Sequence, residues 1–344
     1  MCESPITEKC KIVSAIFCPF LIFLMGMAMT RNLDAEEAGP LRLVQTIPLP
    51  NVEGRIDHMA VDVKGQRLFI AALGNNSVEV LDLRAGKHLQ SIGGFDEPQG
   101  IGFIPEFDKI FIANGKSGAC DILNGTSFKR ITTVKFADDA DNVRYDGTAR
   151  RVYVGYGSGA LGVIDPVNGN QIGDIKLDAH PESFQLEKSG SRIFVNLPDA
   201  KKIVLVDREA RKTIATWPAT GAAANFPMAL DEPHHRLLVG FRKPARLLVF
   251  DTESGKVMTN LESPGDADDI FYDSSRRRVY VSGGDGSIGV FQQQDGDHYQ
   301  PMAKIPTAAR ARTALFVPEL DRLYLAVPHR GSQKAEVRVY EAQP

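Results

Sequence analysis

One pattern of polar and apolar residues returns along this chain at nearly constant spacing. Each copy begins with a basic residue, and three large apolar residues follow it. Successive copies begin 42, 42, 41, 44, 42 and 44 residues apart. The copies are Arg67-Leu-Phe-Ile, Lys109-Ile-Phe-Ile, Arg151-Val-Tyr-Val, Arg192-Ile-Phe-Val, Arg236-Leu-Leu-Val, Arg278-Val-Tyr-Val and Arg322-Leu-Tyr-Leu. Short runs of this kind, bounded by Gly, Asn and Asp, are typical of β-strands.

Each copy belongs to a longer unit with four strand signals. In the first unit we predict strands over residues 58–62, 67–71, 77–82 and 87–92, with turn residues between them. A period of roughly 40–45 residues built from four short strands is typical of a β-propeller. The sequence therefore predicts an all-β, seven-bladed β-propeller. The last unit lacks a fourth strand, so we expect the N-terminal strand at residues 41–48 to join the last blade and close the ring.

The repeat units also carry a family resemblance. Ile193-Phe-Val-Asn196, followed by Ile203-Val-Leu-Val-Asp207, resembles the repeat of the YVTN-repeat, or YncE-like, seven-bladed propellers. The resemblance covers about residues 41–342 and implies the same fold for a single domain over residues 41–344. It implies little about activity, because one fold serves many functions and function depends on individual sites.

The first forty residues differ in composition from the repeats. Lys9 and Lys11 precede an apolar run from Ile12 to Ala28, which is typical of a signal peptide. The run is also long enough to be an uncleaved membrane anchor, with the polar residues up to Pro40 as a tether. We therefore expect a periplasmic or secreted protein that meets a membrane only through an uncleaved N-terminal segment.

Cysteines and charge narrow the class of protein further. Three of the 4 cysteines precede residue 40, which leaves Cys120 alone in the repeats as a small buried apolar residue. The net charge is −3 and the basic residues are scattered, which argues against a nucleic-acid partner. We expect a monomer that binds a small molecule, a glycan or a protein.

The candidate site comes from positions that the repeat does not share. In a propeller, the first strand of each blade lines the central channel and the loop before it lines one mouth. Alignment of the seven units gives an outer ring of loop residues: Arg55, Glu97, Asp139, His180, Ala224, Asp266 and Arg310. Two residues later comes an inner ring: Asp57, Gln99, Asp141, Glu182, Phe226, Asp268 and Arg312. The next position in each unit contributes His58, Asn142 and Asp269 among others.

Carboxylates dominate these positions, and crowded carboxylates require protonation, arginine partners or a bound cation. Oxygen-rich ligands favour Ca²⁺ or Mg²⁺, which is the cofactor we expect if there is one. The candidate metal ligands are Asp57, Asp141, Asn142, Glu182, Asp268 and Asp269. Further candidates for ligand binding are His58, Glu97, Asp139, Asp266 and Arg310. The alternative is that these groups only form internal salt bridges around a water-filled channel.

Three residues are candidates for catalysis. His180 lies next to Pro181 and close to Glu182, so its imidazole is placed to move protons. Arg55 and Arg312 are placed to hold an anionic substrate. The structural alternative for these residues, and for His58, is hydrogen bonding within the loops.

Two functions remain open on these grounds. The first is an exported binding or scaffold protein that uses its acidic channel mouth. The second is a metal-dependent lactonase or esterase, by architectural resemblance to gluconolactonase- and paraoxonase-type propellers, in which a channel metal polarises a carbonyl. A cofactor-bearing propeller has no support, because the sequence lacks a Cys-x-x-Cys-His motif for haem.

Overall fold

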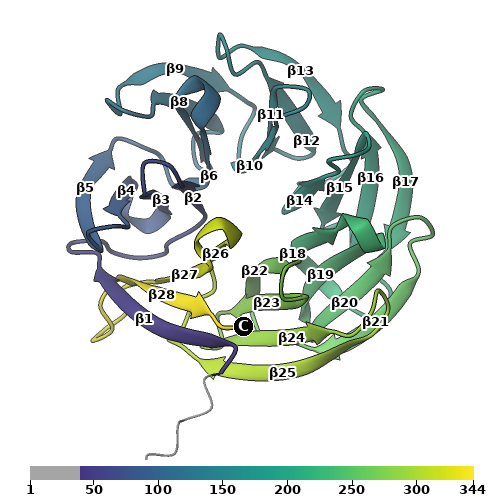
Figure 1. Cartoon of the computed structure of the whole chain (residues 1–344). Coiled ribbons are helices and arrows are strands. Elements are labelled where there is room, and N and C mark those ends of the chain that lie inside the picture. Colours follow the sequence, from purple (N-terminus) through teal and green to yellow (C-terminus); the bar gives the residue numbers. More distant parts are fainter. Residues whose placement is uncertain (1–38) are drawn as a thin grey trace, which may run out of the picture. The chain divides into compact units, whose positions relative to one another are not determined.

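The computed structural model describes residues 39–344, and these form a ring of seven sheets with four antiparallel strands each (Figure 1). This confirms the predicted seven-bladed β-propeller. The predicted leader lies, except for Gly39 and Pro40, outside the described residues, as do Cys2, Cys10 and Cys18. No helix among the described residues is long and apolar enough to span a membrane.

The blades follow the chain in order, and each runs from the channel outward. Blade one is β2 (Met59–Asp62), β3 (Arg67–Ala72), β4 (Ser77–Asp82) and β5 (Lys87–Gly93). Blade two is β6 (Pro98–Ile104), β7 (Lys109–Asn114), β8 (Ala119–Asn124) and β9 (Arg130–Lys135). Blade three is β10 (Ala140–Asp146), β11 (Arg151–Tyr156), β12 (Ala160–Ile164) and β13 (Gln171–Lys176). Blade four is β14 (Phe184–Leu186), β15 (Arg192–Leu197), β16 (Lys202–Asp207) and β17 (Lys212–Pro218).

The remaining blades have the same plan. Blade five is β18 (Ala223–Asp231), β19 (Arg236–Lys243), β20 (Ala245–Asp251) and β21 (Val257–Glu262). Blade six is β22 (Ala267–Asp273), β23 (Arg278–Gly283), β24 (Ser287–Gln293) and β25 (Tyr299–Pro306). Blade seven is β26 (Ala314–Val317), β27 (Arg322–Val327), β28 (Glu336–Ala342) and β1 (Leu41–Pro48). Four short 3₁₀ turns also occur: η1 (Leu73–Asn75), η2 (Pro105–Phe107), η3 (Glu232–His234) and η4 (Pro318–Leu320).

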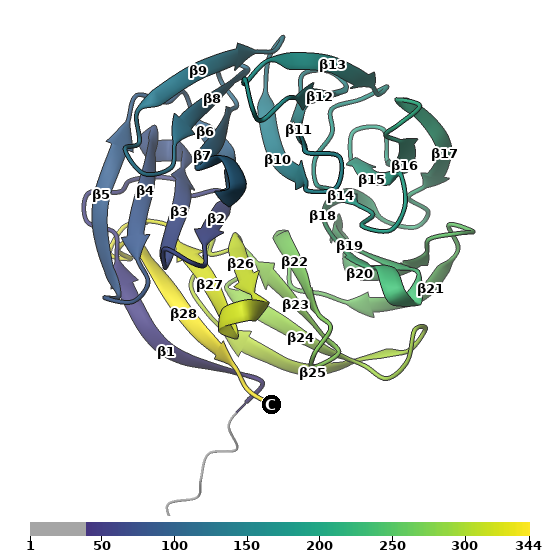
Figure 2. The same cartoon turned by 45° about the horizontal axis from the view of Figure 1, so that its top comes forward.

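The N-terminal strand closes the ring as expected. β1 pairs antiparallel with β28 from Leu41 opposite Ala342 to Pro48 opposite Glu336, and the two strands lie side by side in both face views (Figures 1 and 2). The backbone N–H of Gln343 also donates to the carbonyl of Pro40 at 3.0 Å. Sheet seven therefore joins both ends of the folded ring.

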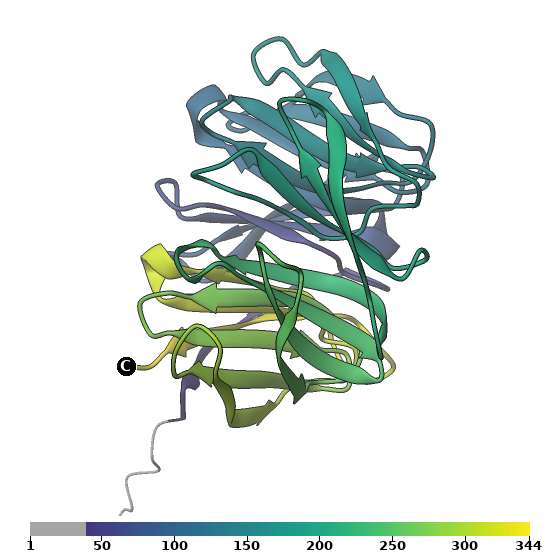
Figure 3. The ribbon, with the colours of Figure 1, turned by 90° about the vertical axis from the view of Figure 1, so that its right-hand side faces the viewer.

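The repeated phrase forms the second strand of every blade, and its burial explains its composition. In β3, β7, β11, β15 and β27 the first residue is partly exposed and the next five are buried. Both faces of these strands pack against neighbouring blades, because sheets stacked around a ring leave little solvent between them. Cys120 lies in one of these interfaces and is fully buried, as predicted. Turned to its side, the ring shows the outer strands of its blades, with connecting loops at both faces (Figure 3).

Candidate cation site at the channel mouth

All seven inner-ring residues line one cavity at a mouth of the channel. The cavity has a volume of about 410 Å³ and includes Asp57, Gln99, Asp141, Glu182, Phe226, Asp268 and Arg312. They meet because each lies within the first strand of its blade or shortly before it, and the seven first strands surround the channel. The alignment of the repeats thus identified residues that the fold brings together.

The outer ring behaves differently. Only Arg55, Asp139 and His180 of that ring line the same cavity. The other four are among five outer-ring residues that adopt left-handed backbone, with positive φ: Glu97, Asp139, Ala224, Asp266 and Arg310. This position is a turn before the first strand, where Asp is tolerated for conformational reasons. Glu97 and Arg310 are exposed, and neither lines the cavity.

Ion pairs engage several of the candidate carboxylates. Arg55 Nη2 lies 2.7 Å from Asp57 Oδ2, and Arg312 Nε lies 2.9 Å from Asp268 Oδ2. Arg242 also pairs with Asp268. Asp266 accepts from Arg312 at 3.0 Å and from Arg310 at 2.9 Å. For Asp266 and Asp268 the internal salt-bridge alternative therefore describes the observed contacts.

His58 and Asp269 form a pair deeper in the channel. His58 Nδ1 lies 3.6 Å from Asp269 Oδ1, and Asp269 Oδ2 accepts from the backbone N–H of Ala314 at 2.8 Å. Burial opposes a charge on His58, but Asp269 and then Asp57 overcome it and raise its pKa to about 10. His58 is therefore an imidazolium at neutral pH.

Asp141, His180 and Glu182 remain, and they form a compact group. One potential ligand atom from each lies within 4.8 Å of the other two. The Nδ1 atom of His180 lies 2.7 Å from the carbonyl oxygen of Gly157, so Nδ1 carries the proton and donates. In the neutral imidazole Nε2 keeps its lone pair, and it lies 3.8 Å from Oδ2 of the exposed Asp139. This arrangement, in which a backbone carbonyl fixes the tautomer, is common for metal-binding histidines.

The two carboxyls of this group are short of partners. Asp141 is only 6% exposed, and its Oδ1 has no hydrogen-bond partner among residues 39–344. Burial and the nearby Glu182 raise the pKa of Asp141, and burial and Asp268 raise that of Glu182. Asp57 Oδ1 and the side-chain oxygen of Asn142 are likewise buried without a partner in this part of the chain. Within the described part of the chain, buried oxygen atoms of Asp57, Asp141 and Asn142 are therefore left without hydrogen bonds at the channel mouth.

A glycine allows the backbone beneath this group to pack closely. A Cβ on Gly100 would lie 2.1 Å from the carbonyl oxygen of Asp141 and 3.1 Å from the Cα of Asn142. Blades two and three approach here more closely than any side chain on Gly100 would permit. Gly100 thus helps to set the position of Asp141.

Arg242 lines the cavity but was not identified from the sequence. Its guanidinium lies 3.6 Å from the ring centroid of Phe226 and donates from Nε to the carbonyl of Ala267 at 2.9 Å. A signal was available: six residues after the basic residue of the repeat, the other blades have only Leu, Gly or Pro. Arg242 is the one charged residue at that repeat position.

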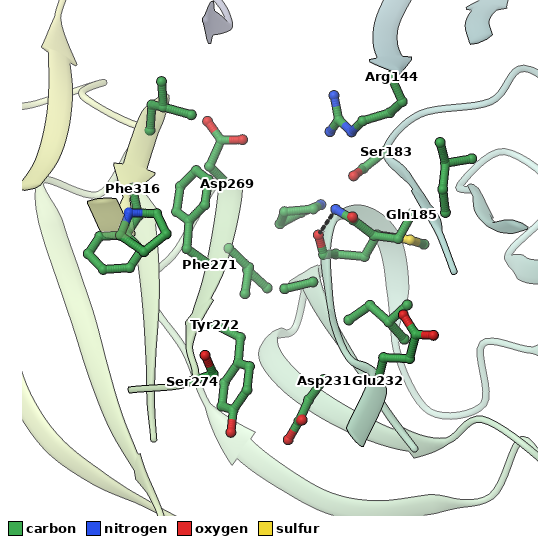
Figure 4. Close-up of a pocket in the computed structure, with 18 of the residues that line it drawn as sticks. Arg144, Ser183, Gln185, Asp231, Glu232, Asp269, Phe271, Tyr272, Ser274 and Phe316 are labelled. Atoms are coloured by element: carbon green, nitrogen blue, oxygen red, sulfur yellow. Dashed lines mark hydrogen bonds between the residues drawn. The ribbon is translucent and has the colours of Figure 1, made fainter. Parts of the chain in front are cut away.

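A second, larger cavity occupies the channel beyond His58, which lines both cavities. Its volume is about 990 Å³, and the first strands of several blades form its walls. Figure 4 shows Arg144 and Asp269 toward one end and Asp231 and Tyr272 toward the other. Much of the wall is apolar: Met59, Ile101, Leu186, Met228, Leu230, Ile270, Phe271, Leu315 and Phe316.

Comparison with known proteins identifies the fold only. No family model and no curated protein matches the sequence. A chain of hydrazine synthase from Kuenenia stuttgartiensis is similar in structure, with a TM-score of 0.71 and 15% identity over 80% of this chain and 94% of that one. A chain in the crystal structure of a mitotic checkpoint complex has a TM-score of 0.75 and 12% identity over 96% of this chain and 100% of that one. Both similarities are to β-propellers, a fold that commonly serves binding or scaffolding.

Proposed function

We propose that this protein is a binding propeller that holds a divalent cation between Asp141, His180 and Glu182 and, beside it, a small anionic molecule. The observation that carries the proposal is the buried Oδ1 atom of Asp141, which has no hydrogen-bond partner among residues 39–344 and lies next to Glu182 and His180. Two neighbouring buried carboxylates repel each other when both are ionised, and a cation between them removes that cost.

The ligand types bear on the choice of ion. The original expectation of Ca²⁺ or Mg²⁺ rested on six oxygen ligands, but Asp57, Asp268 and Asp269 have ion-pair partners of their own. One imidazole with two carboxylates suits Zn²⁺ or Mn²⁺ better than ions that prefer oxygen alone. We therefore place Zn²⁺ and Mn²⁺ first and Ca²⁺ second.

Arginines support the binding of an anion in the same cavity. Arg55 and Arg312 both line it, and Arg55 is exposed while Arg312 is largely buried. A carboxylate or phosphate group of a ligand would then contact both the cation and a guanidinium, which is the strongest type of hydrogen-bond partner for such groups. The cavity volume of about 410 Å³ suits a small molecule rather than a glycan chain or a protein segment.

Metal titration tests the proposal. Metal-free protein is titrated with Zn²⁺, Mn²⁺ or Ca²⁺ and followed by calorimetry and thermal unfolding. A free-ion concentration of about 100 times the dissociation constant should stabilise the fold by about 2.7 kcal/mol. Asp141→Asn and His180→Gln should abolish that shift, whereas Glu97→Gln, which removes an exposed carboxylate outside the cavity, should retain it. Absence of a shift with all three ions, or a shift that survives Asp141→Asn, would refute the site.

One feature favours the second candidate, a metal-dependent lactonase or esterase. Among residues 39–344, three potential protein ligands converge and line the mouth cavity, as in catalytic metal sites that keep a position for water. A metal in this position would supply Lewis-acid activation of a carbonyl, while Arg55 and Arg312 would orient an anionic substrate. Turnover of simple lactones and aryl esters by the metal-loaded protein, and its loss in Asp141→Asn, distinguishes this candidate from binding alone.

We also propose that the chain is an exported member of the YVTN-like propellers that works as a monomer. The repeat phrases at Ile193 and Ile203 support the family, and the composition of residues 1–40 supports export. Cell fractionation with N-terminal sequencing tests the location and the cleavage of the leader. A cytoplasmic protein with an intact N-terminus would refute export.

A further inference from the structure

The larger channel cavity combines apolar walls with charged groups, of which His58 and Asp269 pair with each other. A volume of about 990 Å³, lined by aliphatic and aromatic side chains together with polar and charged ones, is within the range of small-molecule sites. At its outer end, Lys188, Glu232 and His235 are exposed to solvent. Glu232 already accepts hydrogen bonds there from the backbone N–H groups of Lys188 and Ser189.

Arg144 lies at the inner end, on β10, and points into the cavity (Figure 4). Its guanidinium donates to the carbonyl of Val143 at 2.9 Å and lies 5.7 Å from the ring centroid of Phe184. No carboxylate among residues 39–344 forms an ion pair with it. Asp269 faces it across the cavity but is held by His58 and by the N–H of Ala314. Burial lowers the pKa of Arg144, although Asp269 and Asp141 oppose that change.

An arginine without an ion pair in a largely apolar cavity is costly unless a ligand completes its environment. Of its five donor groups, one is engaged by Val143. Two neutral polar groups lie nearby on β14 and the residue before it: the hydroxyl of Ser183 and the side chain of Gln185. The amide nitrogen of Gln185 donates to the carbonyl of Met228 at 2.9 Å, which holds this side chain in place.

We propose that this cavity binds a small monocarboxylate with an apolar body, with the carboxylate on Arg144 and Ser183 and the body along the apolar wall. The planar guanidinium matches a carboxylate through two parallel hydrogen bonds. The Ser183 hydroxyl would add a further donor. The walls formed by Met228, Phe271 and Leu315 would bury an alkyl or aryl group. This site is separate from the proposed cation site and does not depend on it.

Decanoate and decanol form the decisive pair of probes, because they share an alkyl chain and differ in charge. Binding to the wild-type protein is measured by calorimetry at neutral pH, below the concentration at which decanoate aggregates. We expect decanoate to bind at least about tenfold more tightly than decanol, because its carboxylate forms a charge-assisted hydrogen-bonded pair with Arg144. Arg144→Gln should remove this preference, and Arg144→Lys should retain part of it. Arg84→Gln, which removes an exposed arginine and the same unit of charge, should leave it unchanged.

Each outcome decides the proposal. Equal binding of the two probes, no binding of either, or a preference that survives Arg144→Gln would overturn it. The wild-type comparison needs no variant, so a misfolded variant leaves the test intact. Repetition in EDTA separates the two sites: decanoate binding should persist without metal, whereas loss of binding in EDTA would assign it to the mouth cavity and overturn the channel proposal.

Discussion

The two cavities of the channel are built from the same strands but have opposite chemistry. At the mouth, the inner ring contributes four carboxylates and an arginine to a small polar cavity. Three residues later in each unit come Ala60, Gly102, Arg144, Gln185, Ala229, Phe271 and Leu315, and all but Ala60 and Gly102 line the larger cavity. That second set contains a single charge. Among residues 39–344, arginines pair with Asp57 and Asp268 at the mouth but not with Asp141, and in the channel Arg144 has no carboxylate partner. The mouth therefore keeps an unpaired carboxyl group and the channel an unpaired guanidinium.

The boundary between the two regions is the place where a substitution should have the largest effect. Asp269→Asn leaves the His58 imidazolium largely buried without its nearest counter-charge, while the new side chain still accepts from Ala314. We expect the free energy of unfolding to fall by about 3 kcal/mol at neutral pH. Chemical denaturation measures it. The double variant His58→Gln/Asp269→Asn should regain part of the lost unfolding free energy. A loss below about 1 kcal/mol for Asp269→Asn would show that the His58–Asp269 pair does not stabilise the fold.

The mouth should be more sensitive than the channel to a change in backbone spacing. Gly100→Ala places a methyl group against the carbonyl of Asp141, so we expect a loss of about 2 kcal/mol in unfolding free energy and weaker metal binding. Gly102→Ala is the matched control on the same strand, since its Cβ would meet only a methyl group of Val143, at 3.1 Å. Equal effects of the two substitutions on metal affinity would contradict a positioning role for Gly100.

The two regions should also differ in their response to pH. Because the pKa of Asp141 is raised in the fold, folding favours its protonated form, and that stabilisation is lost as the pH rises toward the raised pKa. The Asp141→Asn side chain does not ionise, so the stability of this variant lacks that dependence on pH. In metal-free protein, we expect the stability of Asp141→Asn relative to wild type to increase by at least about 1 kcal/mol between about pH 5 and pH 8. Arg144→Gln should show no such trend, and a flat difference for Asp141→Asn would contradict the raised pKa.

The smallest effect is expected where a second arginine remains. Arg242→Gln removes one ion pair of Asp268 and the contact with Phe226, but Arg312 still pairs with Asp268. We expect a loss of about 1 kcal/mol in thermal or chemical unfolding. Arg312→Gln should lower the free energy of unfolding more in the Arg242→Gln variant than it does in the wild-type protein. Strict additivity of the two would contradict a shared role in neutralising Asp268.

The fold was predictable because its determinant is periodic. Seven copies of one burial pattern specify seven blades, and the missing fourth strand of the last unit specifies the closure by residues 41–48. The inner ring was predictable for the same reason. The outer ring was less predictable: Glu97 and Arg310 occupy exposed turns with positive φ and lie outside the mouth cavity, so their role in binding stays a prediction.

Side-chain pairing was not predictable, because it depends on the reach of individual residues. The sequence placed Asp141 and Asp268 in equivalent positions, yet within residues 39–344 Asp268 has two arginine partners and Asp141 has none. Arg242 extends from the second strand of its blade into a cavity that we assigned to first strands and their loops. Arg144 lies three residues beyond the inner ring on its strand, where no other unit has a charged residue, so the repeat does not point to a site there.

The pairing of β1 with β28 has a consequence for how the chain is assembled. During synthesis, the strand at residues 41–48 has no partner in its own sheet until residues 336–342 are available. The blade that contains this N-terminal strand is therefore completed last. The contact between Pro40 and Gln343 also means that a short linker could join the two ends of the ring. Circular permutants opened between other blades would then keep every strand pair while changing which blade is completed last, and their refolding rates would report what this closure contributes.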